Sequence, residues 1–423
     1  NHLGICYEGI VHNALKHSAP TRTENIKLHH HGYNQDNEQM ERKFARTSEL
    51  LKKQINDDTE NPVPHHYLAV SYLDRDMNDE CIKEALEAIR LFELQNSDSQ
   101  LRLLSYYSAS VAFYRKNELS NAEKYAIKLL SIYSEYLDAH CLLSSIYFLK
   151  KEYTKCIEST KTFLDLLKTI ESNSKNVLSI PYNTLQHARL AYSRMAIIFF
   201  EQKKEQEGLQ ALRDSINSAE NKGEPYFIIS KHFAEQEDSK LAEKFLVDGI
   251  KENPGNKDLL YYAADLYEKS GATDKALNNL KIITKCHPDE TPAHYKQGLI
   301  YLEKCQYDEA IKSFKSVTKI YPNNFEALFH TAIAYEGTGN SAQSKEIYNV
   351  LTQINPDNPE VMVRLGSLYL REEDNTGAKE YFLKLLNYEK YLTEAHLCLS
   401  RIYIALNDPE SCIRSCDALL EML

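Results

Sequence analysis

From residue 38 onward the sequence has the hydrophobic pattern of helices, and that pattern returns with a fixed period. The first helical segment, Glu38–Ile55, is amphipathic and carries both acidic and basic residues. Farther along the chain, Pro254, Pro288, Pro322 and Pro356 lie 34 residues apart. A fixed period of this length indicates stacked supersecondary units rather than one globular core.

Within each period, an aromatic residue and a small residue occupy fixed positions. The aromatic residues in strict register are Phe199, Phe233, Tyr267, Tyr301, Tyr335, Tyr369 and Tyr403. Nine positions after them come Gly208, Ala242, Ala276, Ala310, Ser344, Ala378 and Cys412. Small residues let two antiparallel helices approach closely, and proline ends the second helix because it lacks an N–H. Each period therefore predicts two helices joined by a turn.

The helix pairs resemble the tetratricopeptide repeat (TPR), and three more of them are predicted upstream, around Tyr72, Phe113 and Tyr147. The expected fold class is all-α: a TPR α-solenoid of about ten helix–turn–helix repeats with a short β-containing N-terminal remnant. The predicted domains are the remnant (1–34), a linker helix with a first block of three repeats (35–167), an inter-block loop (168–185) and a second block of seven repeats (186–423).

A binding groove is expected along the first helices, because TPR arrays bind peptides or proteins on their concave surface. In the register of the resemblance, the fifth residue of each first helix faces this groove. Four consecutive aromatic residues at that position would form a ladder, namely Phe227, Tyr261, Tyr295 and Phe329. Aromatic side chains give a large contact area at low entropic cost. The alternative is that these rings pack against the neighbouring repeat.

Charged residues fall on further groove positions, namely Lys231, Asp258, Asp265, Glu326 and Arg401. They do not share one sign, so a clamp for a carboxylate or for a basic terminus is not evident. The alternative for these residues is a solvated polar position without a partner.

The charge and the cysteines limit the classes of function. The formal net charge is −11, with 50 Lys and Arg against 61 Asp and Glu, which argues against nucleic acid as a partner. No apolar run approaches the length of a membrane span, and no signal peptide is recognised. The nine cysteines include no CxxC pair, which favours buried free thiols over a zinc or disulfide role. A cytoplasmic location is therefore expected.

The N-terminal segment differs from the rest of the chain. Residues 5–15 and 25–34 have the pattern of two short strands joined by a polar loop. Three consecutive histidines, His29–His31, lie in the second segment. Neighbouring residues of a strand point to opposite faces, so only His29 and His31 could share a metal ion.

The same segment resembles the end of the catalytic domain in bacterial family 2 glycosyltransferases of the GT-A fold that carry a C-terminal TPR tail. The matching residues are Tyr7, Gly9, Val11, His12, His30, His31, Gly32 and Tyr33. The resemblance implies a parent enzyme that uses a nucleotide sugar and a divalent metal (Mg²⁺ or Mn²⁺). In that parent, His12 would be a metal ligand or a structural core histidine. This chain itself is expected to hold no cofactor and no catalytic residue.

Two functions are consistent with these features. In the first, the solenoid of a bacterial glycosyltransferase recruits or orients a protein or peptide acceptor for sugar transfer by an upstream catalytic domain. In the second, the chain is a stand-alone TPR scaffold without a catalytic role. Whether the parent protein is an enzyme stays open, as does a homo-oligomer formed through an unsealed terminal repeat. The Asp74-Arg75-Asp76 sequence is interpreted as a turn between two helices, not as a sugar-nucleotide metal motif.

Overall fold

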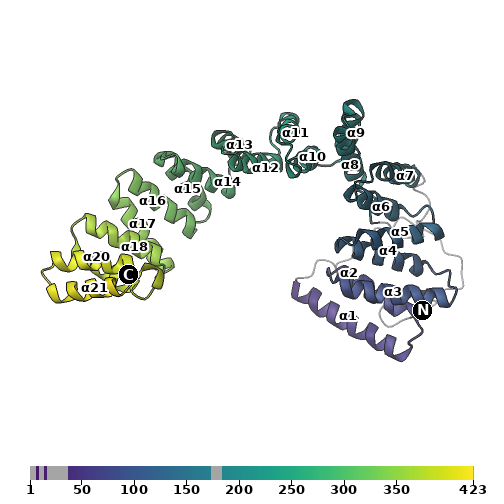
Figure 1. The fold of residues 1–423 in the computed structure, drawn as a ribbon, viewed down its shortest axis with the longest axis horizontal. Coiled ribbons are helices and arrows are strands. Elements are labelled where there is room, and N and C mark those ends of the chain that lie inside the picture. The colour runs from purple at the N-terminus through teal and green to yellow at the C-terminus, as the bar shows by residue number, and fades with distance from the viewer. Residues whose placement is uncertain (1–5, 9–13, 17–36, 173–182, 423) are drawn as a thin grey trace. The chain divides into compact units, whose positions relative to one another are not determined.

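A computed structural model of the chain describes residues 6–8, 14–16, 37–172 and 183–422. The chain divides into two compact units, which meet between Gln236 and Glu237. Figure 1 shows both units as stacks of helices that follow one another in chain order.

Unit 1 begins with a single helix, and helix pairs follow it. Its helices are α1 (Asn37–Asp57), α2 (Pro62–Leu73), α3 (Asn78–Leu94), α4 (Gln100–Arg115), α5 (Leu119–Ile132), α6 (Leu137–Leu149), α7 (Tyr153–Ser172), α8 (Ala188–Glu201), α9 (Glu205–Ser218) and α10 (Glu224–Glu235). The predicted amphipathic helix at residues 38–55 is α1. It packs against α2, and the Phe44 ring meets the Tyr72 ring edge-on at 6.1 Å.

Unit 2 continues the same arrangement. Its helices are α11 (Ser239–Glu252), α12 (Lys257–Lys269), α13 (Thr273–Cys286), α14 (Thr291–Glu303), α15 (Tyr307–Ile320), α16 (Phe325–Gly337), α17 (Ser341–Ile354), α18 (Pro359–Arg371), α19 (Asn375–Leu385), α20 (Leu392–Ala405) and α21 (Pro409–Glu421). A short 3₁₀ helix, Glu389–Tyr391, precedes α20.

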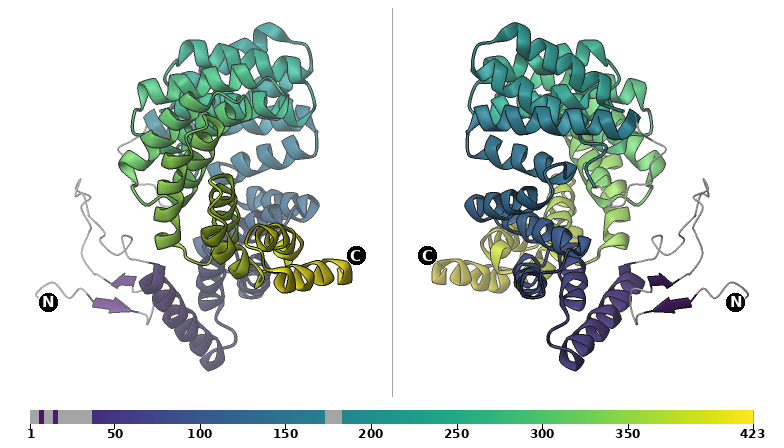
Figure 2. Two further views of the ribbon diagram at one scale, coloured as in Figure 1. Left: turned by 90° about the vertical axis from the view of Figure 1, so that its left-hand side faces the viewer. Right: turned by 90° about the vertical axis from the view of Figure 1, so that its right-hand side faces the viewer.

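The predicted helix pairs are present. The two helices of a pair pack together in α2–α3, α4–α5, α6–α7, α8–α9, α12–α13, α14–α15, α16–α17, α18–α19 and α20–α21. The remaining predicted pair, α10 and α11, lies on the two sides of the unit boundary. First helices of successive pairs also contact one another, as in α2–α4, α6–α8 and α14–α16. The first helices therefore lie beside one another in unit 1, and α14 lies beside α16 in unit 2. Figure 2 shows the helices from two further sides.

The turn inside each pair has one shared backbone feature that the sequence interpretation did not foresee. Four positions after each register aromatic, the chain adopts a positive φ. These residues are Asp76, Asn117, Lys151, Lys203, Glu237, Gly271, Cys305, Gly339, Glu373 and Asn407. In most of these turns the next residue donates its N–H to the carbonyl of the register aromatic, for example Ala272 to Tyr267 at 2.8 Å. This left-handed cap ends the first helix and starts the second.

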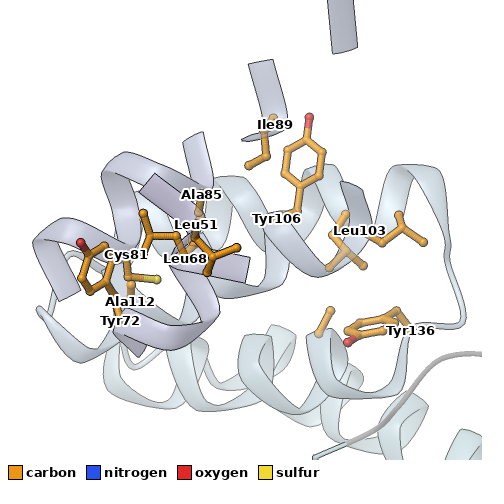
Figure 3. Packing of buried hydrophobic residues seen from close by; sticks show 14 residues of the cluster. Leu51, Leu68, Tyr72, Cys81, Ala85, Ile89, Leu103, Tyr106, Ala112 and Tyr136 are labelled. Carbon is orange, nitrogen blue, oxygen red and sulfur yellow. The ribbon is translucent and has the colours of Figure 1, made fainter. Parts of the chain in front are cut away.

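The small residues of the register lie in the core, as the period predicts. Cys81, Ala122, Ala276 and Ala378 are fully buried, whereas Cys412 of the last pair is only half-buried. Figure 3 shows the core at the start of unit 1, where Leu51 of α1 meets Leu68 of α2 and Ala85 of α3. Each unit is thus held together by a series of local clusters rather than by one central core.

The loop between α7 and α8 is anchored to α6 by a buried carboxylate. Asp138 is fully buried in the first turn of α6. Its oxygens accept hydrogen bonds from Asn183 N at 2.8 Å, from Thr184 N at 3.1 Å and from the Thr184 hydroxyl at 2.6 Å. Most of the predicted inter-block loop, residues 173–182, lies outside the described residues. The predicted division into blocks at 35–167 and 186–423 stays a prediction.

At the N-terminus, two short strands lie where one strand was predicted. Strand β1 (Cys6–Glu8) pairs antiparallel with β2 (Ala14–Lys16). The prediction had a single strand at residues 5–15, and β2 extends one residue beyond it. The second predicted strand, residues 25–34, and both His12 and His29–His31 lie outside the described residues. The helical fold is therefore the supported part of the prediction, and the β remnant gains no support.

Candidate protein-binding surface

The predicted ladder residues lie in the first halves of four first helices. Phe227 belongs to α10 in unit 1, whereas Tyr261, Tyr295 and Phe329 belong to α12, α14 and α16 in unit 2. All four side chains are half-buried. Part of each ring is therefore available to a partner, and part packs inside the repeat array.

Tyr261 is tied to the next repeat by a carboxylate. Its hydroxyl donates to Glu290 Oε1 at 3.1 Å, and Lys257 Nζ donates to Glu290 Oε2 at 3.0 Å. Burial, followed by the Glu290 carboxylate, raises the pKa of Tyr261. Although partial burial acts in the opposite direction, the bonds from Lys257 and Tyr261 lower the pKa of Glu290. The Glu290 carboxylate is therefore held by both Lys257 and Tyr261.

Tyr295 and Phe329 belong to a continuous aromatic cluster. The Tyr295 ring lies edge-on to Phe314 at 5.6 Å and tilted against His330 at 5.8 Å. His330 in turn stacks on Phe314 at 5.5 Å and meets Phe329 edge-on at 5.7 Å. Both the groove interpretation and the packing alternative describe part of this geometry, since the rings pack together and stay half-exposed.

The charged residues predicted for the groove differ in their pairing. Asp265 forms an ion pair with Lys296, and Lys231 lies 3.9 Å from Glu235 on its own helix. Asp258 and Arg401 have no ion-pair partner among the described residues. Their role as partner contacts stays a prediction.

A row of unpaired carboxylates was missed by the sequence interpretation. Four of the five first helices of unit 2 carry an exposed acid at one position of the 34-residue register: Asp258, Glu326 and Glu360 are the second residues of α12, α16 and α18, and Glu394 is the third residue of α20. None of the four forms an ion pair with a described residue, whereas Asp265 and Glu290 do. An acid in the first turn stabilises a helix through its dipole. The signal was visible as a 34-residue spacing, but the pairing state is a property of the tertiary structure.

A hollow of about 270 Å³ lies beside Tyr295 in unit 2. Its lining residues come from α14, from the end of α15 with the turn that follows, and from the start of α16: Thr291, Pro292, Tyr295, Val317, Tyr321, Asn324 and Glu326. Tyr321 is 56% exposed, whereas Val317 is buried. The hollow thus combines two aromatic rings, an apolar side and one carboxylate.

Unit 1 contains larger hollows of mixed character. One of about 500 Å³ is lined by Leu164, Lys168, Arg189 and Tyr192 among others, and one of about 410 Å³ lies beside His65. His65 Nδ1 is 2.6 Å from Glu84 Oε2. In another part of the unit, Arg194 donates to the Ser145 hydroxyl at 2.6 Å.

The described residues contain no cluster of side chains suited to a metal ion. No cluster of three or more His, Cys, Asp or Glu side chains suited to a metal ion occurs in residues 37–172 and 183–422. The Asp74-Arg75-Asp76 segment forms the turn after α2, as predicted, and Arg115 pairs with Asp76 at 2.8 Å. Among the described side chains, eight cysteines are free thiols, of which Cys81, Cys141 and Cys156 are buried, whereas Cys286, Cys305 and Cys416 are exposed.

Two surface features bear on association with membranes and with other copies. In the described part of the chain, every helix is too short or too polar to cross a bilayer. On α21, Ile413 and Leu420 are 60% and 68% exposed, so the last helix carries apolar side chains without cover among the described residues. The predicted self-association stays a prediction.

Comparison with known families identifies the repeat. Residues 301–365 and residues 359–391 each match a family model described as tetratricopeptide repeat. This part of the chain therefore consists of TPRs, and the same 34-residue register of aromatic residues extends from Phe199 to Tyr403.

Several solved structures resemble parts of the chain. The MamA protein has 17% sequence identity and a TM-score of 0.37, over 39% of this chain and 90% of MamA. YrrB, described as a TPR protein with an unusual peptide-binding site, has 15% identity and a TM-score of 0.37, over 42% of this chain and 91% of YrrB. A tetratricopeptide repeat protein from Parabacteroides merdae has 18% identity and a TM-score of 0.34, over 55% and 93% of the two chains. The search of curated protein sequences returned no match.

Proposed function

We propose that the chain is a protein-interaction scaffold, and that the first helices of unit 2 bind an extended segment of a partner protein. The observation that carries this proposal is the composition of one helix face. On α12, Asp258, Tyr261 and Asp265 follow one another at the spacing of a single face. The same face of α14 and α16 presents Tyr295 and Phe329, both half-buried. Aromatic side chains are enriched in protein interfaces, and polar groups at their rim add electrostatic complementarity to a partner.

The character of the repeat supports this proposal. Repeat arrays offer extended surfaces, and their successive units present equivalent side chains at regular intervals. An extended peptide can therefore contact several repeats of one unit with successive side chains. Phe227 and Lys231 lie in unit 1, and we propose them as contacts on the surface of that unit alone.

The test is an unbiased selection of ligands. Random peptides displayed on phage are selected on the immobilised chain, and the affinities of synthetic copies are then measured by calorimetry. The double variant Tyr261→Ala/Tyr295→Ala should weaken binding by about tenfold or more, because central aromatic residues dominate binding surfaces. The matched control is Val350→Ala, since Val350 is 40% exposed on a second helix, α17.

Loss of fold must be separated from loss of contact in this test. The thermal midpoint of each variant is measured beside its affinity, and Tyr261→Phe/Tyr295→Phe serves as the conservative pair. Peptides that bind wild type and the folded double alanine variant equally would show that the ladder is not the binding surface.

We further propose that the scaffold serves a bacterial glycosyltransferase by presenting a protein or peptide acceptor. This proposal is supported by the resemblance of residues 1–34 alone, through Tyr7, Gly9 and His12 in the first segment and Gly32 and Tyr33 in the second. The metal ion and the nucleotide sugar belong to the parent enzyme in this proposal.

The mass of the protein isolated from its native source tests that proposal. A mass well above 48.8 kDa, followed by turnover of a nucleotide sugar by the isolated protein, is the expected result. A native mass of 48.8 kDa would leave the protein-interaction scaffold as the function and would remove the link to sugar transfer.

A further inference from the structure

The residue before each first helix of unit 2 usually caps that helix. Asn256, Asn324 and Asn358 occupy this position, and their side-chain oxygens accept from Leu259 N, Ala327 N and Val361 N at 2.8–3.1 Å. Such a cap satisfies an N–H that the helix leaves free. The equivalent residue before α14 is Glu290, which makes no cap and bonds to Lys257 and Tyr261 instead.

Because of this difference, the neighbouring ladder residues Tyr261 and Tyr295 have different polar surroundings. Beside Tyr261, the Glu290 carboxylate and the Lys257 ammonium pair with each other. Beside Tyr295, the equivalents of Lys257 and Glu290 are Thr291 and Asn324. Asn324 is committed to the cap of α16, and the Tyr295 hydroxyl has no hydrogen-bond partner in the described part of the chain. The contact of Glu290 with Lys257 and Tyr261 therefore has no equivalent beside Tyr295.

The hollow of about 270 Å³ lies at this second site. Tyr295 and Tyr321 supply two aromatic rings, and Pro292 and Val317 supply apolar surface. Glu326 also lines the hollow, is exposed, and pairs with no cation in the described residues. Glu326 is close enough that its charge adds to burial in raising the pKa of Tyr295. The carboxylate and the ring thus line the same hollow.

This combination suits a long cationic side chain. The alkyl stem of Lys or Arg packs on apolar and aromatic surface while its charged end stays in contact with water or with an anion. Cations are also attracted to the faces of aromatic rings. In the repeat before, the chain's own Lys257 pairs with Glu290. At the second site Thr291 stands in place of Lys257, so a cation bound at Glu326 would come from another molecule.

We infer that the hollow binds a Lys or Arg side chain from an extended basic segment of the partner protein, with the charged end at Glu326 and the stem between Tyr295 and Tyr321. This inference rests on the proposed function and names the chemistry of its partner. Further along the same unit, the unpaired Glu360 and Glu394 repeat the position of Glu326 on α18 and α20. A segment with several basic residues therefore finds several carboxylates. The net charge of −11 favours the approach of such a segment.

The test measures binding of oligolysine, oligoarginine and oligoglutamate peptides of equal length by fluorescence anisotropy at low ionic strength. The two basic peptides should bind to the whole chain, and oligoglutamate should not. Glu326→Gln should weaken the basic peptides about five- to tenfold, as expected when a charge-assisted contact is lost. Glu346→Gln is the matched control, because Glu346 is an exposed acid of α17 that has no ion pair in the described residues and does not line the hollow.

The aromatic part of the hollow is tested separately. Tyr321→Ala should weaken the basic peptides about two- to fivefold, and Tyr321→Phe should keep their affinity, because the ring and not the hydroxyl makes the contact. Tyr321 is largely exposed, so the fold should tolerate both changes.

Two results would overturn the inference, and they can be told apart from failure of the scaffold proposal. If Glu326→Gln and Glu346→Gln weakened the binding of basic peptides equally, the loss of affinity would follow from the change in net charge and not from a contact with Glu326. Absence of basic-peptide binding, with selected peptides that are acidic or neutral and depend on Tyr261 and Tyr295, would reject the basic partner and keep the scaffold. Failure of every selected peptide to depend on those tyrosines would reject the scaffold surface itself.

Discussion

At the scale of single residues, the close approach of paired helices depends on glycine at Gly298. A Cβ built on Gly298 would lie 2.4 Å from Cε1 of Phe314. Phe314 is fully buried and is held between the Tyr295 and His330 rings, so it cannot move aside without disturbing the aromatic cluster. The position of the Tyr295 ring thus depends on Gly298, which is buried and lies outside the proposed binding surface.

We expect Gly298→Ala to destabilise the chain by about 1–2 kcal/mol, since overpacking costs more than the helix propensity of alanine returns. Urea unfolding followed by circular dichroism measures this change. Gly255→Ala is the control, because its Cβ would lie at an ordinary 3.8 Å from Cys286 Sγ. Equal stability of wild type and Gly298→Ala would mean that Phe314 has room to shift.

His330 is a second residue with a measurable effect, because burial lowers its pKa below the usual 6.5. The facing carboxylates of Glu326 and Glu360 oppose this shift without cancelling it. The unfolded chain therefore takes up a proton at His330 at a higher pH than the folded chain does. Stability from this residue is complete above pH 6.5 and is lost as the pH falls below that value.

Urea unfolding between mildly acidic and neutral pH should show this loss for wild type and a smaller loss for His330→Phe, which keeps the stacked ring. His187, whose pKa burial also lowers, accounts for part of the remaining slope. His287→Asn, at an exposed histidine, is the control. An unchanged slope in His330→Phe would exclude His330 as the source.

At the scale of elements, the turn inside each helix pair is the most regular feature. Each of these turns has a residue with positive φ, but only Gly271 and Gly339 among them are glycines. Any other residue type is strained in this conformation, because its Cβ approaches the following carbonyl. The remaining turns, such as that at Glu373 with a φ of 61°, therefore hold a small conformational strain.

We predict that Glu373→Gly stabilises unit 2 by about 0.5–1 kcal/mol, and that Gly271→Ala destabilises it by about 1 kcal/mol. A Cβ at Gly271 would meet nothing within 4 Å, so the second change reports on backbone conformation alone. Urea midpoints of the two variants should move in opposite directions. Movement in the same direction would contradict a common origin in the left-handed turn.

At the scale of the whole molecule, each unit is a stack in which a helix contacts mainly its neighbours in sequence. Local damage in such an array spreads to the adjoining repeats and fades with distance along the stack. Asp138 offers a place to test this, because its three hydrogen bonds hold residues 183–184 against α6.

We expect Asp138→Ala to cost about 2–4 kcal/mol of local stability, because it leaves buried donors without an acceptor. Hydrogen exchange should become faster in α6 and α8 and should stay unchanged in α14–α18 of unit 2. Asp165→Ala, at an exposed position of α7, is the control. Faster exchange throughout both units would mean that the chain unfolds as one cooperative body.

The periodic residues of the sequence alone determined the helix pairs and their family. An aromatic residue, a small residue and a proline at 34-residue spacing suffice, because a close-packed pair of helices needs these residue types at these places. The fifth position of the first helix also followed from the register, so that Tyr261, Tyr295 and Phe329 could be named. Residues 5–15 were predicted as one strand, whereas β1 and β2 pair with each other in this region, since a few alternating residues fit several pairings.

Only the tertiary structure decided how those residues differ from one another. Tyr261 and Tyr295 are equivalent in the sequence pattern, yet one is bound to Glu290 and the other borders a hollow with an unpaired Glu326. Likewise, the acids at the second helix position look like ordinary helix-dipole residues until the ion pairs around them are known. Pairing depends on which side chains the neighbouring repeat brings within reach, and that distance is set by packing across repeats rather than by spacing within one.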